Sequence, residues 1–273
     1  MAIITISREL AALGDETAQE VAKLLGYRFV DKQIIEHAIT SRGFSEKKLE
    51  KYDERKPTFW ASLSQDRDDY IHYLKAALYS EAVKGNCVFM GRGAGAIFKD
   101  LPATLSIRLV APMSIRINRV KSYFRCDDKR ARQIVDQSDH DRAGFHKYFF
   151  DFDLSKAEYF HVTLNTGAMH PSLVAKIIKS LADSIVTEEA EKLSQVKLKE
   201  LVLAQEVEHH ILYIRKIPIH FLEVSSTDDS VVLHGVANSQ ASVESALAAA
   251  KEVSKVRSVQ SEIQVVQEYS VMP

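Results

Sequence analysis

The sequence predicts an α/β fold in which a parallel sheet has helices on both faces. Short apolar runs and longer helical stretches alternate five times between residues 3 and 186, an order typical of such sheets. Polar or glycine-rich residues follow three of the expected strands, at Ser7–Gly14, Asp31 and Gly91–Gly95. Because the carboxyl ends of parallel strands lie at one edge of a sheet, we expect these three groups to converge there.

The first strand, loop and helix are the part of the chain on which this prediction depends most. Ile3, Ile4 and Ile6 form the apolar run of a buried strand. Asp15–Leu25 follows as a helix with one apolar face, and Gly26 ends it. The loop between them would place the helix N-terminus over the carboxyl end of the strand, which makes it a candidate anion site.

The loop does not decide by itself whether it binds phosphate. A phosphate loop needs glycines, whose amides close around the anion, and a lysine for charge. On the pattern G-x-x-x-x-G-K-[ST], Gly14 takes the second glycine, but Asp15 stands at the lysine and Glu16 at the serine or threonine. Both acids also suit the first turn of a helix, where each stabilises the dipole by about 0.3–1 kcal/mol.

The other expected elements complete the alternation. A third strand, Cys87–Met90, runs directly into Gly91–Gly95. Arg92 lies between two glycines at the end of this strand, which suits bidentate anion binding; the alternative is a glycine turn with a surface arginine. The remaining strands are expected at Tyr27–Val30, Leu105–Val110 and Phe160–Leu164, and the remaining helices at Ile34–Thr40, Asp66–Lys84 and Pro171–Val186.

Two polar stretches each allow two interpretations. Ser41–Ser64 is either a solvated segment or a flap beside a substrate site. A basic stretch after the fourth strand is either a helix–turn–helix with a solvated face or a lid that brings arginines to transferring phosphates. Asp139 and Arg142 follow it three residues apart, so the carboxylate can orient the guanidinium across a helical turn. The basic residues are Arg116, Arg119, Lys121, Arg125, Lys129, Arg130 and Arg132.

Composition argues against several classes of protein. A formal net charge of −1 and a pI of about 6.8 provide no overall attraction for nucleic acid or membrane. Cys87 and Cys126 are too few for a disulfide framework or metal cluster, and Cys87 is expected to be a small core residue. We find no signal-peptide pattern and no apolar run near the roughly 20 residues that span a bilayer. These features predict a cytoplasmic protein.

The order of these motifs resembles that of the cytidylate kinase-like family, a branch of the P-loop nucleoside monophosphate kinases. The resemblance covers about residues 1–186 and implies a three-layer P-loop kinase-like domain. It also implies a monophosphate-binding insertion near Thr40–Arg67 and an arginine lid near Ser122–Phe150. The motifs are ITISRE, which ends at Glu9, LGYRFVDKQII at Leu25–Ile35, VFMGRGAGAIF at Val88–Phe98, the turn Ala111–Pro112, and DQSDHDR at Asp136–Arg142.

The resemblance implies phosphoryl transfer from ATP, with Mg²⁺, to a nucleoside monophosphate such as CMP or to a similar small acceptor. It implies no protein metal ligand that we can assign. The implied roles are ATP binding by Ser7, Arg8, Gly14 and Thr17, acceptor binding by Asp31, Arg92 and Gly93, and catalysis by Arg92, Arg116, Arg119, Asp139 and Arg142.

The chain departs from the family pattern in the loop. Family members usually carry a G-S-G-G-like loop followed by a basic residue, whereas this chain has Ala11–Asp15, with the sequence AALGD. Lys32 and Gln33 also follow Asp31, where cytidylate kinases have serine and glycine. At about 4 Å and an effective dielectric constant near 20, the repulsion between Asp15 and a phosphate charge is on the order of 4 kcal/mol.

The C-terminal third resembles a BON domain over about residues 197–267, with Gly235 at the glycine of that family. The resemblance implies an αββαβ module that binds lipid or mediates association, and we divide the chain into residues 1–186 and 197–273. Acidic residues of this module oppose binding to anionic lipid, so we expect the module to mediate self-association or docking on the kinase-like domain. The expected elements are the helices Glu188–Tyr213 and Ser239–Val253 and the strands Ile217–Val224, Val231–Val236 and Val256–Val266.

Two functions therefore compete. The first is an enzyme that transfers phosphate from ATP to a nucleoside monophosphate. The second is a degenerate kinase fold that binds or senses a nucleotide and signals through the BON-like module. Asp15 distinguishes them, because an enzyme must accommodate its charge. A nucleotide is the expected ligand and a second copy or another protein the expected partner, while nucleic-acid and membrane binding are not expected.

Overall fold

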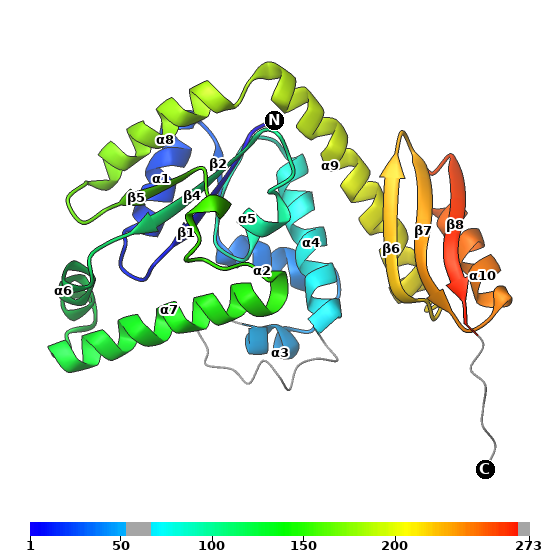
Figure 1. Cartoon of the computed structure of the whole chain (residues 1–273), viewed down its shortest axis with the longest axis horizontal. Helices are drawn as coiled ribbons and strands as arrows, with labels where there is room; N and C mark the ends of the chain where they lie inside the picture. The colour runs from blue at the N-terminus through cyan, green and yellow to red at the C-terminus, as the bar shows by residue number, and fades with distance from the viewer. Residues whose placement is uncertain (53–66, 267–273) are drawn as a thin grey trace, which may run out of the picture. The chain divides into compact units, whose positions relative to one another are not determined.

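The computed structural model describes residues 1–52 and 67–266, and the chain divides into two compact units, Met1–Gln195 and Val196–Pro273 (Figure 1). Much of the expected flap Ser41–Ser64, and of the insertion near Thr40–Arg67, lies outside the described residues. The described part of this stretch forms the short helix α3 (Glu46–Leu49) and a 3₁₀ turn, Glu50–Tyr52.

The first unit contains a five-stranded sheet in which all four strand pairs are parallel, as the alternation predicts. The strand order is β2-β3-β1-β4-β5, so β1 lies at the centre. The fifth strand begins two residues later than expected, because Phe160 packs its ring against Phe152, with 5.8 Å between the ring centroids. The strands are β1 (Ile3–Arg8), β2 (Arg28–Val30), β3 (Cys87–Met90), β4 (Thr104–Val110) and β5 (Val162–Asn165).

Helices cover both faces of this sheet. On one face, α1 and α8 pack through Val21 and Ile178 against Ile4 and Ile6 of β1. On the other face, Phe98, after α5, lies between Phe89 of β3 and a tyrosine of α4. Each large apolar side chain buried here contributes about 1.5–3 kcal/mol. The helices are α1 (Gly14–Leu25), α2 (Lys32–Thr40), α4 (Arg67–Val83), α5 (Ala94–Ile97), α6 (Met113–Phe124), α7 (Asp128–Phe150) and α8 (Pro171–Ile185).

The structure confirms the prediction that Cys87 is a core residue. It lies fully buried in β3, and burial raises the pKa of its thiol to about 12. The thiol is therefore neutral and unreactive at physiological pH. None of the described helices is both long and apolar enough to cross a membrane.

The second unit has the expected αββαβ order. Its sheet has the order β6-β7-β8, with β6 antiparallel and β8 parallel to β7. The core is formed by the end of α9, the π-helical turn His210–Ile214 and the alanine-rich α10, which pack on the sheet. Gly235 has a φ of 151°, and a Cβ there would lie 2.9 Å from Ile219 Cγ2 and 3.0 Å from the His220 carbonyl oxygen, so only glycine fits. The elements are α9 (Glu188–His209), β6 (His220–Thr227), β7 (Ser230–Ala237), α10 (Gln240–Glu252) and β8 (Ser258–Val265).

The segment that joins the two units is helical. The two units meet between Gln195 and Val196, within the window from Val186 to Lys197 where we place the boundary, and the helix expected from Glu188 is α9, which continues to His209. The stretch is helical because it lacks glycine and proline and begins with three glutamates, Glu188, Glu189 and Glu191, which stabilise a helix N-terminus.

Candidate functional site

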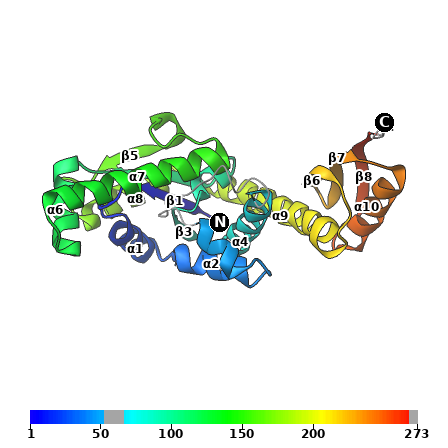
Figure 2. The ribbon, with the colours of Figure 1, turned by 90° about the horizontal axis from the view of Figure 1, so that it is seen from below.

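The three polar strand ends do converge. Strands β2, β3 and β1 are adjacent and parallel, so Asp31, Gly91–Gly95 and the loop after Arg8 all leave the same edge of the sheet. The amide of Gly91 donates to the Ile6 carbonyl at 3.1 Å, which joins the ends of β3 and β1 directly. The long helix α7 crosses this edge, as the two views in Figures 1 and 2 show.

The loop between β1 and α1 contains two left-handed residues although it lacks the usual glycines. Ala11 and Leu13 adopt left-handed conformations, with φ of 59° and 55°. Each costs roughly 1–2 kcal/mol for a residue with a side chain. The first helical hydrogen bond of α1 runs from the Thr17 amide to the Leu13 carbonyl at 3.1 Å. The amides of Glu9, Leu10 and Ala12 are already hydrogen-bonded, so an anion at this place would use the amides of the first turn of α1, which have no partner within the helix.

Contacts from distant elements hold this loop in its strained form. Arg119 of α6 donates to the carbonyls of Ala11 and Thr166, each at 2.8 Å. The Thr166 hydroxyl, which follows β5, donates to the Ala12 carbonyl at 3.0 Å. Burial lowers the pKa of the Arg119 guanidinium, and the charge of Glu16 opposes this shift. Arg119 therefore acts as a clamp on the loop backbone.

Asp139 of α7 connects the loop to two buried arginines. Its carboxylate accepts a hydrogen bond from the Leu10 amide at 2.9 Å and one from Arg116 of α6. Arg142 lies one turn along α7, with 3.6 Å between its Nη1 and Asp139 Oδ1, as the D-x-x-R spacing predicts. Arg116 Nε also lies 3.4 Å from Glu9 Oε2 and donates to a backbone carbonyl. These arginines are therefore paired with acids of the chain itself.

The side chain of Arg8 lies across the start of α1, a position that the loop sequence did not predict. Its aliphatic stem lies against Gly14, where an added Cβ would be 2.6 Å from Arg8 Cγ and 3.1 Å from Arg8 Cβ. Gly14 is thus the residue that lets Arg8 cross the start of α1. Ser7, one residue earlier, accepts a hydrogen bond from Arg108 at 3.4 Å.

The loop does not match a magnesium-binding phosphate loop. Thr17 is fully buried, and its hydroxyl donates to the Leu13 carbonyl at the start of its own helix at 2.6 Å, so the residue is not exposed to a metal at the loop surface. Asp15 and Glu16, exposed at the first turn of α1, stand where the lysine and the hydroxyl residue belong. Within residues 1–52 and 67–266, no group of three or more His, Cys, Asp or Glu side chains could hold a metal ion.

Arg92 forms a second cluster at the same sheet edge. Its φ is 54°, its side chain is 2% exposed, and its Nη1 donates to the Tyr52 carbonyl at 2.8 Å. Its Nη2 pairs with the carboxylate of Glu36 on α2. Gly93 also has a positive φ, 72°, and a Cβ there would lie 2.2 Å from the Phe150 ring. Asp31 caps α2 and accepts a hydrogen bond from the Ile34 amide at 3.0 Å.

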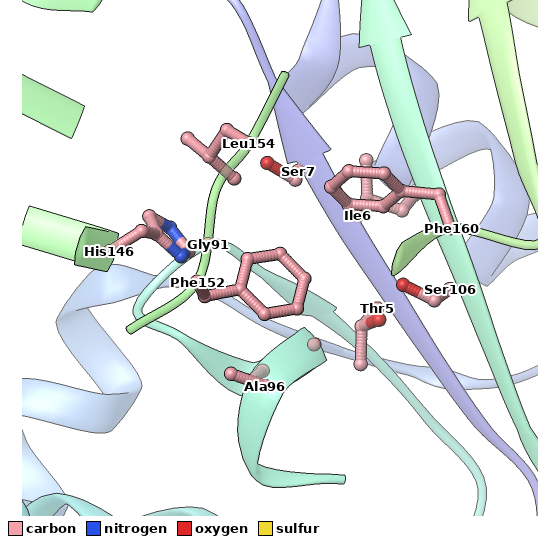
Figure 3. Close-up of a pocket in the computed structure, with 12 residues that line it drawn as sticks. Thr5, Ile6, Ser7, Gly91, Ala96, Ser106, His146, Phe152, Leu154 and Phe160 are labelled. Carbon is pink, nitrogen blue, oxygen red and sulfur yellow. The ribbon is translucent and has the colours of Figure 1, made fainter. Parts of the chain in front are cut away.

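A small cavity between the ends of β1 and β3 has room for about one water molecule (Figure 3). The hydroxyls of Thr5 and Ser106, on neighbouring strands, are buried there without a hydrogen-bond partner among the described residues. Phe152, Phe160 and His146 form its walls. A cavity of this size has no room for a nucleotide.

A family model for the cytidylate kinase-like family matches residues 3–168, which is more than half of the chain. The chain belongs to this family. A second model, the BON domain, matches residues 200–267. No curated protein matches the chain.

Three solved structures are similar to the chain, and one of them has a TM-score above 0.5. An uncharacterised protein from Eubacterium ventriosum is 18% identical, with a TM-score of 0.53, over 67% of this chain and 99% of that one. A shikimate kinase from Acinetobacter baumannii, in complex with shikimate, is 14% identical with a TM-score of 0.39, over 67% and 94%. A sugar kinase from Janibacter is 13% identical with a TM-score of 0.44, over 70% and 98%.

In this cytidylate kinase-like chain, the sequence-predicted residues fall into two groups. Arg116, Arg119, Asp139 and Arg142 meet around the loop, and Arg92, Gly93 and Asp31 lie around the ends of β2 and β3. The roles of Glu36, Glu9 and Thr166 were not predicted from the sequence. Thr166 lies directly after a strand, so its position could have identified it. Nothing local distinguishes Glu36, which is one acidic residue on the surface of a helix.

Proposed function

We propose that the first unit binds a nucleotide at the loop between β1 and α1 and acts as a nucleotide sensor without rapid phosphoryl transfer. The observation that carries this proposal is the combination of a retained anion-binding backbone with an acidic first helical turn, Asp15 and Glu16. A backbone of this shape binds phosphate through its amides, whereas the acids oppose the high charge of a triphosphate.

Two features support binding. The left-handed Ala11 and Leu13 are strained, and the clamps from Arg119 and Thr166 maintain that strain. Strain of this kind is characteristic of ligand sites, because an unused loop would relax. Arg8, across Gly14, brings a positive charge to the start of α1, which is otherwise acidic. An open groove lined by Leu10, Arg130 and other residues of α7 gives room for a nucleoside beside the loop.

Two features argue against rapid transfer. The charge of the missing lysine is replaced by the opposite charge at Asp15. Lid arginines accelerate phosphoryl transfer when they contact the transferring group, but Arg116 and Arg142 are paired with Asp139. Transfer would require these pairs to break, and removing one partner from a buried pair is costly, on the order of 3–5 kcal/mol.

Isothermal titration calorimetry with ADP, ATP and CMP, each with and without Mg²⁺, tests the proposal. We expect ADP to bind more tightly than Mg-ATP, and we expect no ADP formation from ATP and CMP at rates near the 1–100 s⁻¹ of typical kinases. The variant R8M should weaken ADP binding, and R132M, on exposed α7 surface, is its control. Absence of binding for all three nucleotides would contradict the sensor proposal.

One observation favours the alternative, a phosphotransferase that uses CMP or a similar acceptor. Arg119 reaches from α6 directly onto the loop, so a lid arginine already contacts the place where ATP phosphates would bind. For this function, ATP with Mg²⁺ would be the phosphate donor. Micromolar binding of Mg-ATP together with CMP-dependent turnover, both lost in R119M, would establish this function in place of the sensor.

We propose that the BON-like unit provides the output through self-association or docking. Its sheet has two edge strands, β6 and β8, and edge strands can pair with another chain. Light scattering of the full chain and of residues 1–195 tests this, because loss of the second unit should lower the oligomeric state or change ADP affinity. Equal mass per particle and equal affinity would refute it. We further propose a reducing cytoplasm as its location, where the free thiols of Cys87 and Cys126 are stable.

A further inference from the structure

The guanidinium of Arg92 already holds an anion that belongs to this chain. Its Nη2 pairs with the carboxylate of Glu36, and its Nη1 donates to the Tyr52 carbonyl at 2.8 Å. The arginine side chain is 2% exposed, whereas the glutamate side chain is 28% exposed. The positive partner is therefore fixed inside the protein, and the negative partner stands at the surface.

The two partners also differ in how readily they can move. Arg92 follows β3 with a left-handed φ of 54° and is held at Tyr52, so its position is determined by the sheet edge. Glu36 lies on α2 one turn after Lys32, and 3.6 Å separates Lys32 Nζ from Glu36 Oε1. If Glu36 leaves Arg92, Lys32 offers its carboxylate a second cation at the surface. Displacing Glu36 is therefore less costly than leaving a buried carboxylate unpaired.

A guanidinium N–H such as Arg92 Nη2 donates to a carboxylate oxygen and to a phosphate oxygen alike. We propose that Glu36 occupies the position on Arg92 that a phosphate monoester of the acceptor would take, and that the ligand must displace it. Glu36 then sets the affinity and the charge selectivity of this site. The inference rests on the proposed function in that the unit must bind phosphorylated ligands, but it concerns the Arg92 site and not the loop.

The variant E36Q tests the inference by calorimetry with CMP, because glutamine keeps the shape and one acceptor oxygen but removes the competing charge. We expect E36Q to bind CMP at least tenfold more tightly than the wild type and to bind cytidine, which lacks the phosphate, unchanged. The gain should disappear in E36Q/R92M. E20Q, at an exposed glutamate of α1, is the matched control and should bind CMP as the wild type does.

Three outcomes would overturn the inference: CMP affinity that is unchanged or weaker in E36Q, a gain that survives in E36Q/R92M, or a gain for cytidine equal to that for CMP. Absence of CMP binding to both the wild type and E36Q would overturn it as well, while ADP binding at the loop would still decide the proposed function separately. Should thermal melting show that E36Q does not fold, E36D serves instead. Its shortened carboxylate reaches Arg92 less well, so CMP should bind about threefold more tightly.

Discussion

Reversing the charge of Asp15 provides the sharpest test of the loop. Asp15 is exposed in the first turn of α1, next to the amides that precede the first helical hydrogen bond. In water, two unit charges about 5 Å apart interact by about 0.8 kcal/mol. Replacing a negative by a positive side chain beside a phosphate of about two charges therefore changes the interaction by about 3 kcal/mol. Screening at physiological salt, with a Debye length of about 8 Å, reduces this to about 2 kcal/mol.

The variant D15R should therefore bind ADP about 30-fold more tightly than the wild type. Calorimetry at low and at high salt measures this, and the gain should shrink at high salt because the added attraction is screened. E20R, with the same charge change farther along exposed α1, is the control and should gain much less. If D15R and E20R bind ADP equally, no phosphate binds at this helix N-terminus and the argument from the loop fails.

Four further predictions concern stability and organisation. D139A should destabilise the first unit by about 3 kcal/mol, because it removes the carboxylate that pairs with buried Arg116; an unchanged denaturant midpoint would contradict this role. G93A should lower the free energy of unfolding of the first unit by about 2–4 kcal/mol, since its Cβ would lie 2.2 Å from the Phe150 ring at a φ of 72°. The control G26A, with a φ of 67° and nothing within 4 Å of the added Cβ, should lower it by only about 1 kcal/mol in the same thermal melt. Hydrogen bonds from Arg215 and His210 lower the pKa of Glu252 to about 2, below the roughly 4.3 of an unfolded glutamate. The ionised Glu252 therefore stabilises the second unit fully above about pH 4.3, and this stabilisation is lost as the pH falls towards 2. In E252Q the free energy of unfolding of the second unit should depend less on pH in that window, and an unchanged pH dependence would contradict this role of Glu252. Residues 196–273 should melt cooperatively when expressed alone, because one apolar core joins α9, α10 and the sheet; a fragment with no cooperative transition would show that the unit depends on the first.

Local sequence was sufficient to predict the helices and strands of the first unit and the convergence of its polar strand ends at one sheet edge. The alternation of apolar runs with amphipathic stretches predicted five parallel strands, and parallel strands bring their carboxyl ends together whatever their order. The D-x-x-R spacing placed Asp139 and Arg142 on one helix face because the helical repeat depends only on neighbouring residues. Local sequence also predicted the helix from Glu188, which continues across the boundary between the two units.

The partners of the charged side chains were decided by the tertiary structure. Asp139 meets the Leu10 amide across 129 residues, and Arg92 meets Glu36 across 56. No local pattern encodes such pairs, because strand order and helix packing determine which side chains face each other. The same holds for Ala11 and Leu13, whose own preference is right-handed. They remain left-handed because Arg119 and Thr166, from distant elements, hold the loop carbonyls. The sequence by itself determined that three polar strand ends would meet at one sheet edge, and the fold decided that acids of this chain pair with its arginines there.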